Sequence, residues 1–258
     1  MTWDPAAGTV DEAGLEGTEG VVHLAGAGIG EKRWSDERKR LIRQSRVEAT
    51  HALASALARM ATPPKVMVSG SAVGFYGDRG TEVLTEHSAG GTGFLAEVCR
   101  DWEAATAPAA GAGTRVVNIR SGIVLSRHGG ALEKQLPLFR LGLGGKLGSG
   151  KQYMSWVGID DEVGAIVHAV GSEGLRGPVN VTAPEPVPAA ELARALGSVL
   201  RRPVVLPVPR LALAAVLGRE LAGELLASQR ALPARLEADG YTFRHTELEG
   251  ALRALLGR

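Results

Sequence analysis

The chain has 258 residues and a formal net charge of +1, and 45% of its residues are hydrophobic. This composition is typical of a globular protein, and a charge so close to zero gives no reason to expect a nucleic-acid or membrane partner. The single cysteine, Cys99, excludes an internal disulfide and a multi-thiolate metal site. We therefore expect a cytoplasmic protein that holds no metal.

The first half of the chain alternates short apolar runs with longer segments of helical periodicity. Ser35 is placed to cap the first helix, and Pro63 ends it. Strands that alternate with helices over short links predict a parallel sheet covered by helices, which is an α/β fold. Strands are expected at residues 20–25, 65–69 and 115–120, and helices at residues 35–60 and 93–107.

The pattern changes near residue 127, and the glycine-rich residues 141–150 predict a loop or a hairpin. We predict a first domain of residues 1–127 and a second lobe of residues 128–258, with segments near 154–182 returning to the first sheet. A helical module is expected near residues 205–258. Within this half, strands are expected at residues 154–159, 178–182 and 204–208, and helices at residues 160–170, 188–200 and most of 210–258.

Three glycines follow the first predicted strand, at positions 26, 28 and 30. Their spacing is Gly-x-Gly-x-Gly rather than the Gly-x-Gly-x-x-Gly of a phosphate loop, and the next helix begins only at Ser35. A flexible connection is the main interpretation. The alternative is that Ala25, Gly26 and Ala27 are small enough for the backbone of a cofactor to pass close to the strand end.

The second predicted strand ends in Ser69-Gly-Ser71, and a loop with a tyrosine follows. Ligands of open α/β sheets bind at the carboxyl ends of the strands, so Ser69 and Ser71 are candidates for contact with a substrate or cofactor. Local capping of the loop by both hydroxyls is the alternative.

Four segments together resemble the extended short-chain dehydrogenase/reductases: HLAG, SGSAVGFYG, RSGIVLS and GSGKQYMSWVGIDDEVGAI. An atypical subgroup, the "epimerase family" proteins, is similar over the whole chain, most specifically over residues 141–155. The resemblance implies a Rossmann-like parallel sheet that binds NADP or NAD, and a smaller, mostly helical C-terminal substrate lobe. It also implies that Ile123 and Val124 face the nicotinamide, that Arg33 contacts a cofactor phosphate, and that Arg120 fixes the nearby loop.

The chain departs from that class in its catalytic pair. The class uses a tyrosine and a lysine four residues later on one helix face. Here Gly80, Val157 and His245 stand four residues after the three tyrosines. On the helix at 93–107, Leu95 and Cys99 fall where the pair belongs. A cysteine on an apolar helical stripe is usually part of the core, and a nucleophilic Cys99 is the alternative.

The second departure concerns the start of the chain. Met1 to Pro5 resemble a point after the second strand of the family, so the first strand–helix–strand unit and its glycine-rich loop are expected to be missing. A misplaced start, a truncated gene and a protein that has abandoned the cofactor are the alternatives. Binding of NADP or NAD is expected only if that loop is present in the native protein.

The function we predict is that of an NAD(P)-binding oxidoreductase-like or epimerase-like protein with an unknown small-molecule substrate, which Ser71 contacts. A non-catalytic dinucleotide-binding sensor or interaction module is the alternative, since the tyrosine–lysine pair is absent. We expect a monomer or a homodimer. Asp160 and Asp161 are expected to cap a helix.

Overall fold

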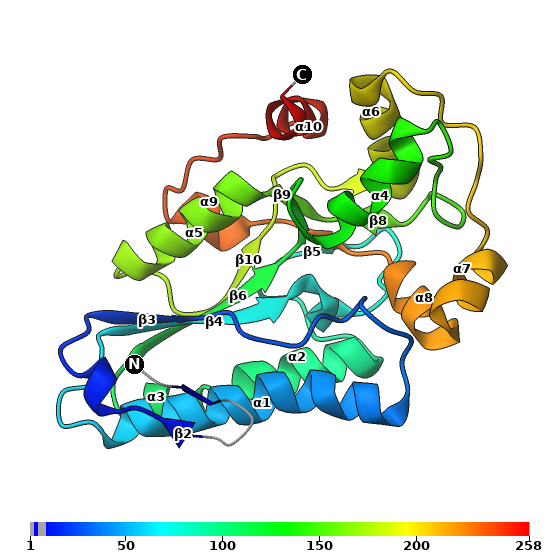
Figure 1. Ribbon diagram of the computed structural model, residues 1–258. Helices are drawn as coiled ribbons and strands as arrows, with labels where there is room; N and C mark the ends of the chain where they lie inside the picture. Colours follow the sequence, from blue (N-terminus) through cyan, green and yellow to red (C-terminus); the bar gives the residue numbers. More distant parts are fainter. Residues whose placement is uncertain (1–2, 5–8, 258) are drawn as a thin grey trace.

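A four-stranded parallel sheet forms the centre of the computed structural model, which describes residues 3–4 and 9–257 (Figure 1). The strand order is β10–β6–β4–β3, and every pair is parallel. Met1 and Pro5, which mark the expected chain start, lie outside the described residues. The strands span Gly20–His23 (β3), Val66–Ala72 (β4), Arg115–Ser121 (β6) and Gly177–Val181 (β10).

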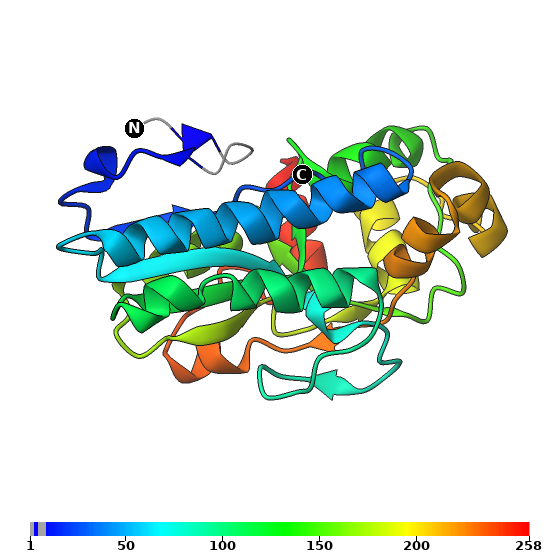
Figure 2. The ribbon, with the colours of Figure 1, turned by 90° about the horizontal axis from the view of Figure 1, so that it is seen from below.

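Helices cover both faces of this sheet (Figures 1 and 2). On one face, Leu57 and Ala109 pack against Met67 of β4. On the other face, Ala165 and Leu236 belong to a core cluster that includes strand residues of β4, β6 and β10. The predicted α/β fold with a Rossmann-like parallel sheet is therefore confirmed. The first face carries α1 Asp36–Arg59, α2 Phe94–Ala104 and α3 Ala107–Gly111, and the second carries α5 Ile159–Gly171 and α9 Ala234–Ala238.

A second core lies beside the sheet and is built around Trp156, whose side chain is fully buried. Leu132 and Leu136 of α4, Leu196 of α6 and Leu252 of α10 belong to the same cluster. Its helices are α4 Gly130–Arg140, α6 Ala189–Leu200 and α10 Leu248–Leu256, and α7 Arg210–Leu217 and α8 Arg219–Leu225 complete this mostly helical part.

Short strand pairs connect these parts. β10 returns to the central sheet beside β6, and β9 pairs with β7. β12 pairs with β5, which joins the segment after α8 to the segment that follows β4. The pairs are β7 Ile123–Leu125 with β9 Trp156–Gly158, β8 Tyr153–Met154 with β11 Val187–Pro188, β5 Val83–Leu84 with β12 Arg230–Ala231, and β1 Trp3–Asp4 with β2 Thr9–Val10. Single turns of 3-10 helix lie at η1 Ala13–Leu15 and η2 Val73–Tyr76.

Local sequence signals explain most of the helix boundaries. The side chain of Ser35 accepts a hydrogen bond from the Arg38 backbone N–H at 3.1 Å, so the predicted cap of α1 is confirmed. The single helix expected at 93–107 is wrong in its C-terminal part, because α2 ends at Ala104 and Pro108 lies in the separate helix α3.

The strand expected at residues 204–208 is also wrong. Only Val208 forms an isolated bridge, with Leu147. Three prolines at 203, 207 and 209 remove the backbone N–H groups that a ladder needs, and they outweigh the apolar pattern.

Among the described residues, no helix is long and apolar enough to cross a membrane.

Candidate functional site

The carboxyl ends of β3, β4 and β6 meet at one edge of the sheet, which is the edge where open α/β sheets bind ligands. Ala25 and Gly26 follow β3, Ser71 lies near the end of β4, and Ile123 and Val124 lie just after β6. The structure thus brings these predicted site residues to the same edge. Ile123 and Val124 are half-buried and pack against the two large core clusters.

Ser71 is hydrogen-bonded to a buried ion pair. Its hydroxyl lies 2.7 Å from Oε1 of Glu103 on α2. Arg120 of β6 donates from Nε to Glu103 Oε1 at 2.7 Å and from Nη2 to Oε2 at 2.8 Å. The two side chains are only 3% and 13% exposed, so the pair depends on this two-point geometry to offset its desolvation. The Ser71 proton is directed to the carboxylate, which leaves the oxygen lone pairs of the hydroxyl as acceptors.

Arg120 also ties this site to the loop after β4. Its guanidinium lies 3.5 Å from the centroid of the Phe75 ring and donates to the Tyr76 hydroxyl at 3.0 Å. Tyr76 in turn donates to Asn180 Oδ1 at 2.7 Å. Burial alone would lower the pKa of Arg120, but the hydrogen bonds and charge of Glu103 outweigh it and raise that pKa. The guanidinium is therefore a fixed positive charge.

Ser69 is placed differently from Ser71. Its side chain is fully buried, and its hydroxyl donates to the Gly70 carbonyl at 3.4 Å. The neighbouring strand residue His23 is also buried, and its Nε2 lies 2.9 Å from the hydroxyl of Thr50 on α1. Burial lowers the pKa of His23 to about 4, so it is a neutral core residue at physiological pH.

The loop between β3 and α1 is held in place by α1. The Ala27 backbone N–H donates to Ser45 Oγ at 3.0 Å, and its carbonyl accepts from Arg46 at 2.9 Å. A Cβ on Gly26 would lie 3.1 Å from the Arg46 guanidinium, which is a reason for glycine at this position.

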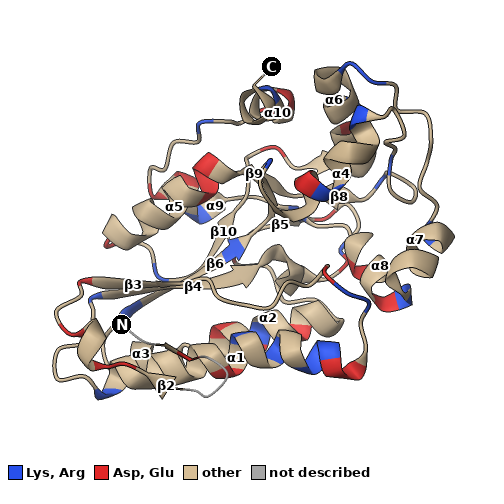
Figure 3. Ribbon diagram, viewed as in Figure 1, with Lys and Arg blue, Asp and Glu red and all other residues tan. Residues whose placement is uncertain are grey.

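Both signs of charge are interspersed along α1 (Figure 3).

Arg33 contacts another part of the molecule. Its Nε donates to the Val216 carbonyl at 2.8 Å, and its Nη2 donates to the Ala215 carbonyl. Both carbonyls lie in the last turn of α7, where a cation complements the helix dipole. The structure thus places this guanidinium at the end of α7, and the expected phosphate contact stays a prediction.

Helix α2 carries Leu95 and Cys99 where the dehydrogenase class has its tyrosine and lysine. The Cys99 side chain is 4% exposed. Burial, and then the nearby Glu103 carboxylate, raises the pKa of the thiol to about 12. A thiol of this kind is neither a general base nor a nucleophile at neutral pH, so Cys99 is part of the core.

Asp161 and Glu162 occupy the first turn of α5 and have different partners. The expected helix cap by Asp160 and Asp161 is wrong, because the N-cap is Gly158 and no side-chain cap hydrogen bond forms. Asp161 accepts hydrogen bonds from the backbone N–H groups of Arg244 and His245, at 2.7 and 3.0 Å, so it fixes the C-terminal segment. Glu162 accepts from Ser121 at 2.5 Å, while its other oxygen is buried without a partner among the described residues. Burial raises the pKa of Glu162 to about 7.

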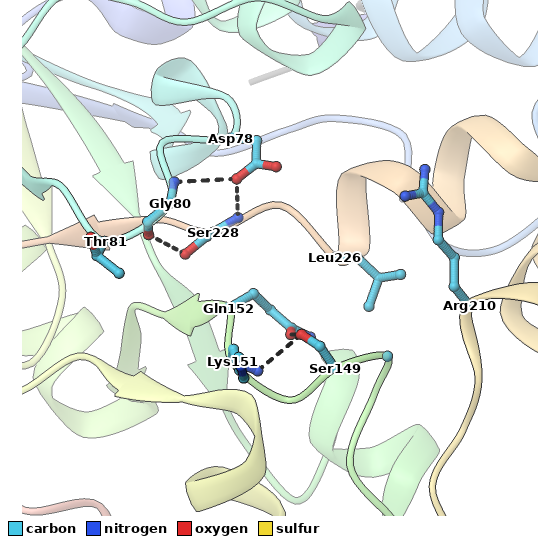
Figure 4. A pocket seen from close by; sticks show the side chains of 10 residues that line it. Asp78, Gly80, Thr81, Ser149, Lys151, Gln152, Arg210, Leu226 and Ser228 are labelled. Carbon is cyan, nitrogen blue, oxygen red and sulfur yellow. Dashed lines mark hydrogen bonds between the residues drawn. The ribbon is translucent and has the colours of Figure 1, made fainter.

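A separate cavity of about 380 Å³ opens between the two parts of the molecule (Figure 4). It is lined by the loop that contains Asp78 and Thr81, by residues 148–152, by Arg210 of α7, and by Leu226 and Ser228. Among the described residues, no cluster of histidine, cysteine and carboxylate side chains could hold a metal ion.

Comparison with known proteins assigns the family. The family model described as "NAD dependent epimerase/dehydratase family" matches residues 7–181, more than half of the chain, and a domain of unknown function matches residues 208–255. The chain belongs to the NAD dependent epimerase/dehydratase family. The predicted resemblance to the epimerase-family proteins is therefore confirmed.

Named relatives extend over nearly the whole chain. Epimerase family protein ML0860 of Mycobacterium leprae is 42% identical over 252 residues, which are 98% of this chain and 81% of the relative. Human epimerase family protein SDR39U1 is 38% identical over 259 residues, which are 99% of this chain and 87% of the relative. The crystal structure of human SDR39U1 (isoform 2) with NADPH superposes with a TM-score of 0.91 at 35% identity, covering 95% of this chain and 86% of the human chain.

Sequence reasoning missed Glu103 as a site residue. The sequence pattern predicts no function for its carboxylate. The available signal was a carboxylate on the helix that packs beside Ser71, together with a buried arginine on the next strand that needs a counter-charge. The short separation of these groups follows from the register that sets Ser71 opposite Arg120 and from the packing of α2 beside these strands.

Proposed function

We propose that this protein binds NADPH at the carboxyl edge of its parallel sheet and is an oxidoreductase-like or epimerase-like member of its family. The observation that carries the proposal is the similarity to human SDR39U1, whose structure was solved with NADPH. Because the backbone similarity covers 95% of this chain, the same sheet edge is available here. The substrate is an unidentified small molecule, and the protein acts in the cytoplasm as a monomer or a homodimer.

The residues at this edge fit a dinucleotide. Ala25, Gly26 and Ala27 are small and partly exposed, so a cofactor can approach their backbone closely. A Cβ on Gly122 would lie 2.5 Å from the Ser155 carbonyl, so the turn before Ile123 requires glycine. In the proposal, Ala25, Gly26 and Ala27 lie along the cofactor, and Ile123 and Val124 form an apolar wall beside the nicotinamide. A bound nicotinamide would supply or accept a hydride.

Ser71 is the polar group that we assign to the substrate. Because its O–H group donates to Glu103, its oxygen lone pairs can accept a hydrogen bond from a substrate hydroxyl. Arg120 binds both oxygens of this carboxylate and restricts its rotation. In this proposal Ser71 orients the substrate, and Glu103 and Arg120 orient Ser71.

The cofactor proposal is tested by fluorescence titration with NADPH and NADH on the wild type and on Ala25→Asp. A carboxylate at position 25 would repel the cofactor phosphates, so we expect the Kd for NADPH to rise about tenfold or more. Ala110→Asp is the matched control, because Ala110 is exposed on α3 away from this edge, and its Kd should equal that of the wild type. If the wild type binds neither nucleotide, the proposal is wrong.

A dinucleotide-binding module without turnover is the second candidate, and the neutral Cys99 thiol at the lysine position favours it. A screen of carbonyl and alcohol substrates with NADPH and NADP⁺ separates the two candidates. Oxidation or reduction of the cofactor that falls in Ser71→Ala supports an enzyme. Tight binding without turnover of any substrate supports the module.

A further inference from the structure

Two segments of the chain form a basic and apolar surface at one end of the molecule. They are residues 138–146, which end α4 and begin the loop after it, and residues 201–217, which lead from α6 to the end of α7. The Arg202 side chain donates to the Arg140 carbonyl at 2.8 Å, and a Cβ on Gly142 would lie 3.7 Å from the Pro203 ring. Figures 1 and 2 both place the two segments at the same end of the molecule, and together they are called the basic–apolar surface.

The basic–apolar surface exposes large apolar side chains. It comprises about a tenth of the chain but contains seven of the fourteen exposed large apolar residues among the described residues. The first segment contributes Leu138, Leu141 and Leu143, and the second contributes Val205, Leu206, Leu211 and Val216. Leu211 is 83% exposed, and Leu141 and Val205 are each 72% exposed. A concentration of exposed apolar residues of this kind marks a site of interaction.

The formal charges of this surface are all positive. Its two segments contain no aspartate or glutamate, and they contain Arg140, Lys146, Arg201, Arg202 and Arg210 (Figure 3). All five side chains belong to exposed residues and form no ion pair with any described residue. Because the whole chain has a net charge of +1 and this surface carries +5, the rest of the chain carries −4. The net charge, which gave no reason to expect a membrane partner, does not show this asymmetry.

The distribution of charge argues against a second copy as the partner. A two-fold symmetric dimer would place this surface against itself, so that cations would face cations without any carboxylate to pair with them. The shape argues against a helix of another protein, which needs a groove. Leu141, Val205 and Leu211 project from three different parts of the surface, and they are too exposed to line a groove. Of this whole surface, only Arg210 also lines the cavity beside Asp78.

We propose that the basic–apolar surface docks the protein onto an anionic lipid bilayer. Leu141, Val205 and Leu211 enter the interfacial region of the lipid, which adapts to side chains that project from separate segments. The arginines and Lys146 bind the lipid phosphate and carboxylate groups, while their alkyl stems lie along the apolar side chains. The protein lies on the membrane surface in this arrangement.

The test is co-sedimentation with vesicles of phosphatidylcholine alone and of phosphatidylcholine with phosphatidylserine. The wild type should bind vesicles with about 30% phosphatidylserine at least about tenfold more tightly than the neutral vesicles. Most of this preference should disappear at about 1 M salt, where charges are screened within about 3 Å. If the protein binds neither kind of vesicle, or binds both equally, the proposal is wrong.

The basic residues are tested by Arg140→Gln/Arg201→Gln. This double variant should bind the anionic vesicles about 20-fold more weakly, because each cation near such a surface contributes about fivefold. Arg40→Gln/Arg176→Gln is the matched control, since it removes two exposed cations from the sheet part of the molecule and changes the net charge equally. If the two double variants lose the same affinity, only the net charge matters and the proposed surface is refuted.

The apolar residues are tested by Val205→Ser, which should weaken vesicle binding about fivefold. Val167→Ser replaces a valine of α5 that is 64% exposed, and its binding should equal that of the wild type. Both side chains are exposed, so thermal melts should show both variants as stable as the wild type. A folded Val205→Ser variant with unchanged vesicle binding would contradict the assigned role of the apolar residues.

Sedimentation velocity without lipid tests the other partners. If the protein self-associates and Val205→Ser abolishes the association, a second copy occupies this surface and the lipid proposal fails. If there is neither vesicle binding nor such association, an acidic protein surface is the remaining partner, and the proposal fails as well. All of these measurements are made without cofactor, so their outcome is independent of the NADPH proposal.

Discussion

At the scale of single residues, the candidate site depends on contacts between side chains of different elements. Ser71, Glu103 and Arg120 come from β4, α2 and β6, and the register of two strands brings them within 2.7–2.8 Å of one another. The sequence pattern places Ser71 at a strand end, and that part of the prediction needs only local reasoning. Its partners depend on helix orientation and strand register, which a single sequence does not specify.

The Glu103–Arg120 pair allows a stability prediction. Glu103→Ala should lower the free energy of unfolding by about 3–5 kcal/mol, because it leaves a buried guanidinium without its counter-charge. The double variant Glu103→Leu/Arg120→Met should recover most of this loss, since it buries no charge. Urea unfolding measures both, and a Glu103→Ala variant as stable as the wild type would contradict the assigned geometry.

Glu162 predicts a pH dependence of stability. Its pKa rises from 4.5 to about 7 on burial, so between these pH values the folded state holds a proton that the unfolded state has lost. The contribution of Glu162 to the free energy of unfolding is therefore fully present below pH 4.5 and is lost as the pH rises through about 7. Relative to the wild type, Glu162→Gln should gain up to about 3 kcal/mol between pH 4.5 and pH 8. The exposed Glu191→Gln serves as control, and parallel stability curves for wild type and Glu162→Gln would refute the assignment.

At the scale of elements, α7 stands out because it is attached by polar contacts rather than by a core. All residues of α7 are described and none is buried. Arg33 binds its last turn, and Lys39 of α1 lies 3.1 Å from Glu220 of the adjoining α8. Glu224 of α8 accepts the Leu95 backbone N–H at 3.3 Å. Sequence periodicity predicted helical structure here, but long-range contacts of this kind leave no periodic signal.

Removal of the Arg33 contact should loosen this element selectively. Arg33→Ala is expected to speed hydrogen exchange of the amides in residues 210–225 about five- to tenfold, because two carbonyls of α7 lose their donor. Exchange in α6 should not change. The matched control is Arg194→Ala, an exposed arginine of α6, and equal exchange in the two variants would mean that Arg33 does not hold α7.

For the molecule as a whole, sequence alone predicted the alternation of strands and helices, the parallel sheet and the return of later segments to it. These follow from hydrophobic periodicity, which each strand and helix carries locally. The strand predicted at residues 204–208 was wrong, because the apolar residues of this proline-rich stretch resemble the pattern of a strand. The structure identifies individual exposed apolar residues: Val22 of β3 and Val167 of α5 are 45% and 64% exposed.

The free edge of β3 and these exposed valines predict self-association. Within the described part of the chain β3 pairs only with β4, so its other edge offers free backbone groups beside exposed valines. Sedimentation velocity should show concentration-dependent association that Val22→Lys and Val167→Lys reduce. Val216→Lys replaces a valine on α7 that is 70% exposed and should not reduce this association. A strictly monomeric wild type would remove the basis of this expectation.

The buried thiol on α2 is an intrinsic probe of local unfolding at this helix. Cys99 is the sole cysteine of the chain, and with a pKa of about 12 almost none of it is thiolate at neutral pH. A thiol reagent can therefore react only in molecules where α2 has lifted from the sheet. The rate of thiol labelling therefore measures the fraction of molecules in which α2 is open, without any introduced probe. A ligand that bridges the sheet edge and α2 would slow the labelling as the ligand occupies more of the protein.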